Sequence, residues 1–444
     1  MASGPTITLI GAGSLTFTPK VLRDVINHPE LRPLTLRLMD IDAEHLGTMS
    51  RLAERLFARL DKPVSVEATT DRREALRGAD YVIVSVEVER YSLWRQDFEV
   101  PKKHGIRQVM GELGGPGGLF HSLRQIPLHV EIARDAAALC PAATIMVESN
   151  PLNRLCLAMR RHSECGPIVG LCHGVEIVQH AIGELLGFAC EDIQTTAAGI
   201  NHFTWVLDLR LKATGEDLYP RFREALQTHD PGWEPLSRKL LDVFGYYPSP
   251  GDAHIGEYLP YAWELCGLKG PPLDQWEQGA PERWAYLDRL ARGEEAEAPS
   301  EAEQEQEELK LREFFGPRSW TDTLALPIIA ALETSTLRRM AAVNLLNEGA
   351  IMNLPPDVFV ELPALADGSG LHALHIGELP RPLAALCRRD IEQMELTVEA
   401  AVTGRRDLAL QAMLLDPVVD SIAAAERILD EMLRSQAQYL PQFA

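Results

Sequence analysis

The stretch Thr6-Ile-Thr-Leu-Ile10, followed by Gly11-Ala12-Gly13-Ser14, decides the fold of this chain. Five strand-forming, largely apolar residues lead straight into a glycine turn, and a helix-compatible segment follows from Lys20 to Ile26. In this order of strand, turn and helix, a dinucleotide pyrophosphate binds to backbone N–H groups at the N-terminus of the helix. Gly11 permits the tight turn, and Gly13 lets the backbone approach phosphates without a Cβ in the way. We therefore predict that Gly11, Ala12, Gly13 and Ser14 bind a dinucleotide.

A second short strand, Leu36 to Asp42, strengthens this prediction. The glycine turn alone is a weak signal, because Thr16 stands where the G-x-G-x-x-G pattern has its third glycine. Asp40 lies at the end of this strand, where an acidic side chain binds the adenosine ribose of NAD in preference to NADP. A glycine turn in some other α/β protein is the competing interpretation. Strand, turn and acid in the required order favour NAD.

Composition and charge limit the classes of function. The chain has 444 residues, of which 46% are hydrophobic and 24% charged, as in ordinary globular proteins. Its formal net charge of −21 argues against nucleic acids and anionic membranes as partners, because both bind positive surfaces. We find no signal peptide before the first strand and no apolar run long enough to span a bilayer. Seven cysteines without scaffold-like spacing indicate reduced thiols, so we expect a cytoplasmic protein.

The first half of the chain alternates strands and helices. The expected strands after Asp42 are 64–68, 80–86, 144–147 and 168–171, and the expected helices are 43–59, 72–77, 121–139 and 176–186. Such alternation predicts a parallel sheet with helices on both faces, in which ligands bind beyond the carboxyl ends of the strands. We therefore expect an α/β fold, with a Rossmann-like doubly wound parallel sheet in an NAD-binding domain over residues 1–196.

From Asn201 onward the alternation fades, which predicts a C-terminal α+β domain over residues 197–444. Strands are expected at 205–211, 341–346 and 357–361, and helices at 218–226, 236–244, 381–402, 405–414 and 418–433. The Glu-, Gln- and Ala-rich stretch 291–309 is typical of an acidic surface insertion without chemistry. We expect this domain to bind the substrate and to form the oligomer.

Polar residues follow several of the expected strands. Ser149-Asn150-Pro151 comes after 144–147, Cys172 comes after 168–171, and His202 follows a short apolar stretch. A cysteine and a histidine about thirty residues apart, each at a strand end, can converge on one metal ion. A buried structural cysteine and a hydrogen-bonded loop histidine explain the same spacing, and a simple Asn-Pro turn explains Asn150.

Two further segments have the composition of site walls. Gly114 to Gly118 holds four glycines and a proline in five residues, which suits close backbone approach or movement. A linker there would interrupt the sheet, so we predict an active-site loop. The segment 246–260 has a turn-rich entry and then Asp252, His254, Glu257 and Tyr258, which predicts a second wall.

Taken together, six motifs resemble glycoside hydrolase family 4. They are, in chain order, Gly11–Ser14, Gly114–Gly118, Ser149–Pro151, Cys172–Gly174, Gly199–His202 and Gly256–Tyr258. The stretch Val358–Ala364 is similar to the C-terminal part of that family, so the resemblance covers essentially the whole chain. It implies an NAD-dependent hydrolase with Mn2+ as the usual ion, assembled as a homodimer or homotetramer.

The resemblance implies redox chemistry in place of the usual pair of carboxylates. Bound NAD+ takes the hydride from C3 of the sugar, which acidifies the neighbouring C2–H. A base removes that proton, the C1 substituent is eliminated, water adds, and the C3 ketone is reduced again. A divalent ion on the C2 and C3 oxygens stabilises the enediolate. Because substrate oxygens complete its coordination shell, two protein ligands suffice.

The metal ligands of the family match Cys172 and His202, and Asn150 matches a residue that contacts both the sugar hydroxyls and the nicotinamide side. The residues after the ligating cysteine vary with substrate across the family. Cys172-His173-Gly174 resembles members that act on unphosphorylated α-glycosides, including α-glucosidases and α-hexuronidases. The 6-phospho-glycosidases usually have Asp or Asn there. We therefore expect an α-hexoside or α-hexuronide as the small-molecule substrate.

Catalytic roles are also implied by the resemblance. Tyr258 matches the tyrosine proposed as the base at C2. The reference pKa of tyrosine, about 10, is too high for a base at neutral pH, but a metal-bound substrate beside the phenol favours the tyrosinate. Asp252 matches an active-site aspartate near the metal and is assigned acid/base work. Glu112 and His173 are expected to contact the leaving group or the substrate.

Other functions share the nucleotide half of the chain. A 6-phospho-glycosidase of the same family differs only in its substrate. A 2-hydroxy-acid dehydrogenase transfers hydride without hydrolysis and needs an arginine-clamped carboxylate and a histidine base, but no cysteine ligand. A non-catalytic NAD sensor would keep Gly11 and Gly13 without requiring Cys172, His202 and Tyr258 together. Release of nitrophenol from α-glycosides, with and without NAD+ and Mn2+, separates these alternatives.

Overall fold

A computed structural model describes residues 4–60, 63–293 and 323–444. Its first half is built on six parallel strands: β1 (Thr6–Ile10), β2 (Leu34–Met39), β3 (Val64–Thr69), β4 (Tyr81–Val84), β5 (Thr144–Val147) and β6 (Ile168–Gly170). They lie in the order β3-β2-β1-β4-β5-β6, with the change of direction between β1 and β4. This is the strand order of a doubly wound nucleotide-binding sheet. The predicted Rossmann-like fold is confirmed.

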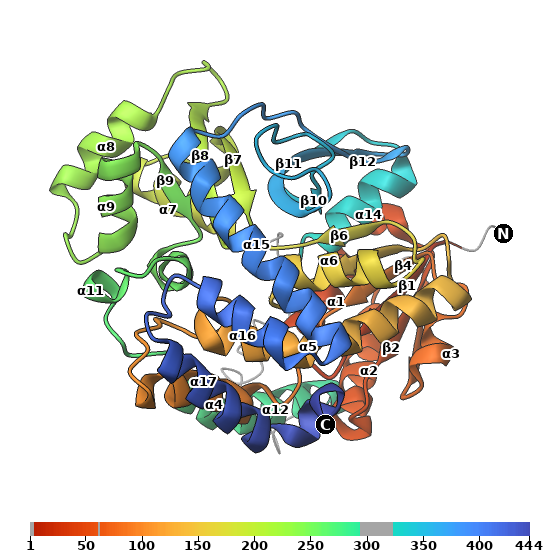
Figure 1. The fold of residues 1–444 in the computed structure, drawn as a ribbon. Coiled ribbons are helices and arrows are strands. Elements are labelled where there is room, and N and C mark those ends of the chain that lie inside the picture. Colours follow the sequence, from red (N-terminus) through yellow and green to blue (C-terminus); the bar gives the residue numbers. More distant parts are fainter. Residues whose placement is uncertain (1–3, 61–62, 294–322) are drawn as a thin grey trace.

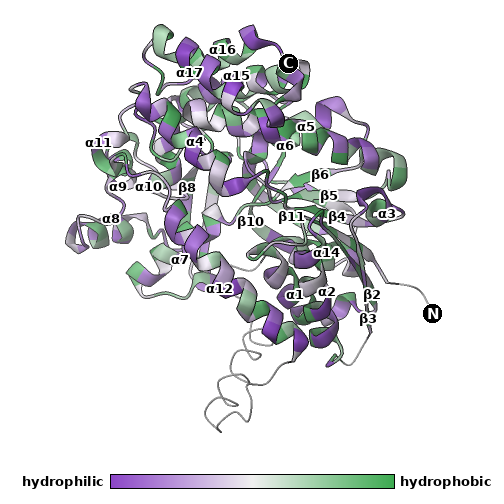
Figure 2. Cartoon of the chain, turned by 90° about the horizontal axis from the view of Figure 1, so that it is seen from below, coloured by the Kyte–Doolittle hydropathy of each residue, from purple (hydrophilic) through white to green (hydrophobic). Residues whose placement is uncertain are grey.

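Helices cover both faces of this sheet (Figure 1). The hydrophobic core on one face includes α1 (Phe17–Asn27), α2 (Ala43–Phe57) and α14 (Ala325–Thr334), with α12 (Leu273–Arg292) packed on α2. The core on the other face includes α5 (Gly115–Leu139), α6 (Leu152–His162) and α15 (Arg381–Thr403), with α16 (Arg406–Leu415) and α17 (Ile422–Ser435) packed on these helices. Figure 2 shows the labelled strands β4, β5 and β6 in hydrophobic green between these layers. Burial of both sheet faces explains why these strands are continuous apolar runs.

The second half of the chain extends the same sheet. The added strands are β7 (Ile193–Ile200), β8 (Phe203–Leu211), β9 (Tyr247–Ser249), β10 (Arg338–Leu346), β11 (Phe359–Asp367) and β12 (Gly370–Ala373). The order continues β6-β10-β11-β7-β8-β9, and these pairings are antiparallel. The hairpin of β10 and β11 therefore lies between β6 and β7, which are neighbours in sequence. The sheet itself does not divide at residue 196.

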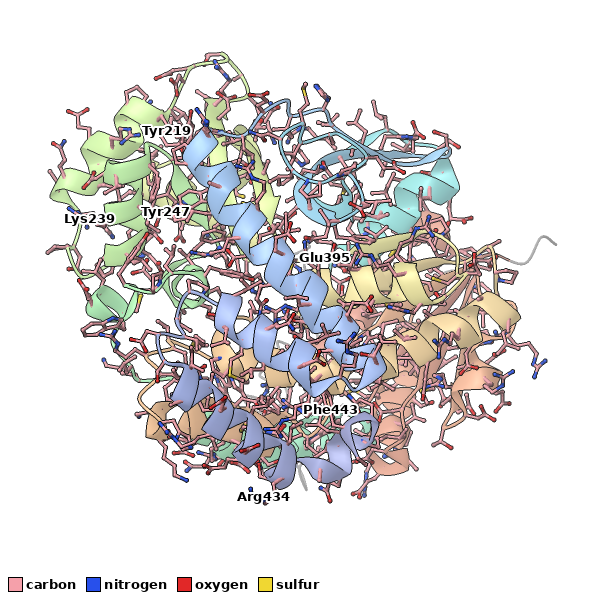
Figure 3. All side chains as sticks on the ribbon, viewed as in Figure 1. Tyr219, Lys239, Tyr247, Glu395, Arg434 and Phe443 are labelled. Atoms are coloured by element: carbon pink, nitrogen blue, oxygen red, sulfur yellow. The ribbon has the colours of Figure 1, made fainter. Side chains whose placement is uncertain are left out.

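The remaining described helices lie in the connections. They are α3 (Arg72–Leu76), α4 (Arg90–Lys103), α7 (Gly174–Leu186), α8 (Tyr219–Thr228), α9 (Pro235–Phe244), α10 (Asp252–Ile255) and α11 (Trp263–Cys266). Figure 3 shows Tyr219 and Tyr247 together beside α8 and α9. The Tyr247 backbone N–H donates to the Tyr219 hydroxyl at 3.1 Å, and the Phe222 ring packs edge-on against Tyr247. This aromatic cluster fixes α8 and α9 on the antiparallel end of the sheet.

Most expected elements are present within a few residues of their predicted ends, but the glycine-rich segment is an exception. Gly114 to Gly118 was expected to be a loop, whereas the structure begins α5 at Gly115. The glycines serve close approach: a Cβ on Gly114 would lie 2.1 Å from the Glu257 carbonyl oxygen. A Cβ on Gly118 would lie 2.2 Å from the Leu113 backbone. The helices α4, α6, α10, α11, α12 and α14 and the strands β7, β9 and β12 were not predicted.

Three other expectations concern composition. None of the described helices is both long and apolar enough to cross a membrane. The seven cysteines all lie in the described residues, and all are free thiols. The predicted acidic insertion 291–309 lies outside the described residues, apart from its first three positions at the end of α12.

Candidate functional site

The predicted nucleotide turn connects β1 to α1. Gly11 has a φ of +94°, and a Cβ there would lie 2.0 Å from the Ser85 carbonyl oxygen, so glycine is required. The backbone N–H of Gly13 donates to Asp40 Oδ2 at 2.7 Å, and the Asp42 N–H donates to Asp40 Oδ1 at 2.9 Å. Asp40 therefore fastens the turn to the end of β2. Sequence reasoning assigned Asp40 to the ribose and missed this contact.

Ser14 and Ala12 complete the turn. Ser14 Oγ accepts a hydrogen bond from the Phe17 N–H at 3.1 Å, in the first turn of α1. The Thr18 hydroxyl donates to the Ala12 carbonyl oxygen at 2.7 Å. The turn is thus held from both sides, with the N-terminus of α1 at its open end. Backbone N–H groups at a helix N-terminus, next to glycines that leave room for phosphate oxygens, fit a dinucleotide pyrophosphate.

The two predicted metal ligands lie together. His202 Nε2 is 3.2 Å from Cys172 Sγ, although β10 and β11 separate their strands in the sheet. His202 has a φ of +59°, and its Nδ1 is buried without a hydrogen-bond partner. Burial, and then the charge of His254, lower the pKa of His202 well below its usual value, so the imidazole is neutral. A neutral imidazole offers the lone pair that a metal needs.

Cys172 completes a donor pair that suits a transition metal. Burial, and then the charge of Glu361, raise the pKa of this thiol far above its usual value. The Gly174 N–H donates to Cys172 Sγ at 3.3 Å. A thiol in such a place becomes a thiolate when a cation lies beside it. Sulfur and imidazole nitrogen 3.2 Å apart can both reach one ion at bond lengths of about 2.0–2.4 Å, so the pair fits a divalent metal.

Glu112 and Asn150 meet beside this pair. Asn150 Nδ2 donates to Glu112 Oε1 at 3.1 Å, and Glu112 Oε2 lies 3.8 Å from His254 Nδ1. The His254 ring packs against the His202 ring with centroids 4.4 Å apart. His254 thus links the Glu112–Asn150 contact to the Cys172–His202 pair. The structure brings together five of the expected or neighbouring site residues in one cluster.

Glu257 is a functional side chain that sequence reasoning placed in a wall without a role. Its Oε2 accepts hydrogen bonds from three consecutive backbone N–H groups, those of Glu112, Leu113 and Gly114. Its Oε1 lies 3.4 Å from His254 Nδ1. The donor atoms of Glu112, His254 and Glu257 all lie within 4.8 Å of one another. Burial lowers the pKa of His254, but the two carboxylates outweigh burial and raise it above its usual value.

Tyr258 lies in the same wall. Its hydroxyl donates to the Asn201 carbonyl oxygen at 3.1 Å, and its ring stacks on Phe203. Burial raises the pKa of Tyr258 well above its usual value, and the charge of Arg154 works in the opposite direction. The hydroxyl is therefore protonated in the protein alone. Its hydrogen-bond acceptor, Asn201, directly precedes His202 in the chain.

Asp252 and His173 are placed differently from the other predicted residues. Both carboxylate oxygens of Asp252 accept hydrogen bonds at the start of α9, from the Leu236 N–H at 2.8 Å and from the Ser237 N–H and hydroxyl at 2.7 Å. In the described residues no hydrogen bond or ion pair joins Asp252 to Cys172 or His202. His173 is the N-cap residue of α7 and follows Cys172 directly.

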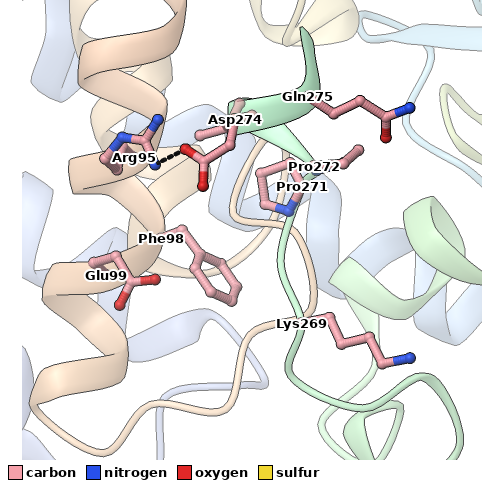
Figure 4. A pocket seen from close by; sticks show the side chains of 9 residues that line it. Arg95, Phe98, Glu99, Lys269, Pro271, Pro272, Asp274 and Gln275 are labelled. Atoms are coloured by element: carbon pink, nitrogen blue, oxygen red, sulfur yellow. Dashed lines mark ion pairs between the residues drawn. The ribbon is translucent and has the colours of Figure 1, made fainter. Parts of the chain in front are cut away.

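A separate cavity of about 320 Å3 lies between α4 and the start of α12 (Figure 4). Phe98, Pro271 and Pro272 line it, and the Arg95–Asp274 ion pair lies at its side, as Figure 4 shows. None of the predicted site residues lines this cavity. The candidate site is therefore the cluster around Cys172 and His202.

Comparison with known proteins agrees with this geometry. The model of family 4 glycosyl hydrolases matches residues 6–188, and the model of their C-terminal domain matches residues 197–419. This chain belongs to glycosyl hydrolase family 4. An alpha-glucosidase from Erwinia rhapontici is 33% identical to it, over 98% of each chain. An alpha-galactosidase from Bacillus subtilis is also 33% identical, over 98% of this family 4 hydrolase and 99% of the relative.

A solved structure shares the fold of this family 4 hydrolase. It is a 6-phospho-alpha-glucosidase from gut microorganisms, in complex with NAD and Mn2+. The TM-score is 0.81 at 22% identity, with 99% of this chain and 100% of that chain covered. The two family models and the relatives of 33% identity show that the chain is a glycoside hydrolase, as the motifs implied.

Proposed function

We propose that this glycoside hydrolase cleaves unphosphorylated α-hexosides with NAD+ and a divalent metal, Mn2+ in the first place. The observation that carries the proposal is the contact of His202 Nε2 with Cys172 Sγ at 3.2 Å, beside Asn150 and Glu112. A dehydrogenase of 2-hydroxy acids has no use for a buried thiol and a neutral imidazole in contact. A metal-dependent glycosidase needs both. The NAD- and Mn2+-bound relative of the same fold supports the choice of cofactors.

When bound, NAD+ supplies a hydride acceptor for C3 of the sugar, and the metal supplies Lewis acidity at the sugar oxygens. In this chain, Gly11 to Ser14 receive the pyrophosphate, with Asp40 holding Gly13 in place. Cys172 and His202 hold the ion. Asn150, held by its hydrogen bond to Glu112, would contact the sugar hydroxyls and the nicotinamide side. Glu112 and His173 contact the sugar or its leaving group.

Tyr258 takes the C2 proton in this proposal. Its phenol must first lose the proton that it shares with the Asn201 carbonyl oxygen, and positive charge close to the phenol oxygen favours that loss. Arg154 already contributes in this direction. Asp252 keeps its assignment to acid/base work only if it leaves its hydrogen bonds to Ser237. In the structure as it stands, it positions α9.

The charge of the site supports a neutral sugar over a uronide or a phosphosugar. In the described residues, none of the side chains bonded to Cys172, His202, Glu112 or Asn150 is lysine or arginine. The guanidinium of the nearby Arg154 is occupied by the Gly118 carbonyl, Ser122 and Gln393. An anionic substituent on the sugar would therefore meet the Glu112 carboxylate and no lysine or arginine among these partners. The relatives that are 33% identical are an alpha-glucosidase and an alpha-galactosidase.

A panel of nitrophenyl α-glycosides tests the proposal. We expect nitrophenol release from the glucoside or galactoside only with NAD+, Mn2+ and a thiol reductant, and much slower release from glucuronide, galacturonide and 6-phosphoglucoside. Hydrolysis in D2O is expected to place deuterium at C2 of the released sugar, since the C2 proton exchanges with solvent during the reaction. Activity without NAD+, giving product free of solvent deuterium, would overturn the redox mechanism. Preference for the phosphorylated substrate would overturn the substrate class.

Four further expectations belong to the same proposal. Residues 197–444 act as the substrate-binding and oligomerisation domain, while residues 1–196 bind NAD. The chain assembles as a homodimer or homotetramer, which light scattering on the eluted protein measures. It works in the cytoplasm, since its seven free thiols and a thiolate ligand need a reducing compartment. Neither nucleic acid nor membrane is expected as a partner.

A further inference from the structure

One row of residues crosses the centre of the sheet beside the candidate metal site. Gly170 of β6 pairs with Asn344 of β10, Asn344 pairs with Glu361 of β11, and Glu361 pairs with Gly199 of β7. A Cβ on Gly170 would lie 2.8 Å from Asn344 Cβ, so this end of the row has no space for a larger residue. Cys172 follows the first residue of the row closely, and His202 follows the last.

Glu361 is the charged member of this row and is 1% exposed. Its carboxylate accepts hydrogen bonds from Asn201 Nδ2 and Asn344 Nδ2, each at 3.1 Å, and from the Thr204 hydroxyl. In the described residues no lysine, arginine or histidine bonds to it. Burial raises the pKa of Glu361, and its three donors offset only part of that effect. A buried carboxylate with neutral donors and no cation is costly unless a positive charge comes close.

Asn201 connects Glu361 to the thiol. Its side-chain amide donates to Glu361 Oε1 and also hydrogen bonds to Cys172. Glu361 and Cys172 therefore share one amide side chain as a hydrogen-bond partner. A divalent cation held by Cys172 and His202 would bring positive charge close to the buried Glu361 carboxylate. Groups that hydrogen bond to a metal ligand typically change metal affinity by about 10- to 100-fold.

We propose that Glu361 is an outer-sphere carboxylate of the metal centre, which orients Cys172 through Asn201 and supplies the negative charge that favours a divalent cation. Glu361 does not touch the ion or the sugar, so it is a positioning residue. The inference rests on the proposed function, because it needs the metal between Cys172 and His202. It goes further by naming the residue that sets the affinity for that metal.

The substitution Glu361→Gln tests this directly, since glutamine keeps the size and an acceptor oxygen for Asn201 but removes the charge. The readout is binding of Mn2+ to the full-length protein, followed by the electron paramagnetic resonance of the free ion. We expect the Mn2+ dissociation constant to rise about 10- to 100-fold. With Co2+ as the probe, the thiolate-to-metal absorption is expected to shift, because the Asn201 hydrogen bond to the sulfur changes.

The matched control is Asp390→Asn, which removes another buried carboxylate, whose polar partner among the described residues is Arg389. It is expected to leave the Mn2+ dissociation constant within about twofold. If Glu361→Gln does not fold, Asn201→Ala cuts the same link with the carboxylate intact and is expected to weaken Mn2+ binding similarly. Unchanged Mn2+ affinity and an unchanged Co2+ spectrum in the folded variants would overturn the inference. Absence of Mn2+ binding by the unaltered protein would instead overturn the metal in the proposed function.

Discussion

Glu257 Oε2 lies 2.7 Å from the backbone nitrogen of Glu112, across 145 positions of sequence. The same oxygen also accepts from the N–H groups of Leu113 and Gly114, so the carboxylate fills a nest of three backbone donors. Glu257 therefore holds the segment that carries Glu112 against the wall that carries Tyr258. Two distant parts of the site are joined by one anion.

Glu257→Gln is expected to lower the free energy of unfolding by about 2 kcal/mol, because hydrogen bonds to a charged acceptor are worth about 1.5–3 kcal/mol. Denaturant unfolding measures this value, and hydrogen exchange of residues 112–114 is expected to accelerate. The control is Glu264→Gln on exposed α11, expected within about 0.5 kcal/mol of the unaltered protein. Equal free energies of unfolding for the two variants would contradict a stabilising role of the Glu257 charge.

Cys172→Ser is expected to abolish tight Mn2+ binding, because a serine hydroxyl does not ionise near neutral pH and is a poor ligand. NAD+ affinity is expected to stay within a few-fold, since Cys172 lies away from the glycine turn. Metal content after dialysis and NAD+ titration give the two numbers. Cys190→Ser is the control and is expected to retain the metal, because the Cys190 sulfur accepts a hydrogen bond from Gln179 and none from the site residues in the described part of the chain. A Cys172→Ser protein with full metal content would contradict the ligand assignment.

Asp40→Asn is expected to weaken NAD+ binding about tenfold, which corresponds to about 1.4 kcal/mol. The change removes the charge that we propose binds the ribose and weakens the hydrogen bond from the Gly13 N–H. Asp42→Ala is the comparison, because Asp42 caps α2 through the Glu44 and His45 N–H groups. It is expected to cost about 1 kcal/mol of stability and to leave NAD+ binding unchanged. If Asp42→Ala weakened NAD+ binding and Asp40→Asn did not, the assignment of Asp40 to the ribose would be wrong.

The Glu87–His121 pair predicts a pH dependence of stability. His121 Nε2 lies 3.0 Å from Glu87 Oε2, and His121 Nδ1 lies 2.8 Å from the Glu112 carbonyl oxygen. Burial raises the pKa of Glu87, but His121 and then Arg90 and Arg124 outweigh it, so the pKa falls below 4.5. Burial and the charge of Arg124 lower the pKa of His121, but the Glu87 carboxylate raises it by more, so the pKa lies above 6.5.

The sign follows from linkage. The stabilisation from His121 is complete below pH 6.5 and is lost as pH rises through its raised pKa, while that from Glu87 is lost as pH falls through its lowered pKa. The stability difference between the unaltered protein and Glu87→Gln is therefore expected to be largest between about pH 4.5 and 6.5. Denaturant unfolding across a pH series measures it, with exposed Glu164→Gln as the flat control. A difference that grows above pH 8 would contradict the ion pair.

The nucleotide half could be predicted from sequence because its signals are local. The five residues of β1, the turn at Gly11 and the acid at Asp40 lie within one short segment, and each obeys a steric or capping rule that neighbours decide. Tertiary contacts are not local. Asp42 caps a helix and Asp40 fastens a turn, yet both are simply acids after a strand in the sequence.

Pairings across the sheet were beyond the sequence for the same reason. Nothing near Glu361 indicates that Asn201 and Thr204 will bond to it, because those contacts depend on β11 inserting beside β7. The glycines of Gly114 to Gly118 indicated close approach correctly, but the partner, Glu257, lies far away in the chain. For Asp252, the motif match predicts acid/base work, whereas its hydrogen bonds in the structure are made to the N-terminus of α9.

The insertion of β10 and β11 between β6 and β7 sets an order for biosynthesis. A nascent chain that has been made as far as His202 already carries both proposed metal ligands. The strands that bring those ligands into register, 338–346 and 359–367, are still untranslated at that moment. A metal that needs both ligands is therefore expected to bind only after Asp367 has left the ribosome, because a chain truncated before that point lacks the two strands that lie between β6 and β7.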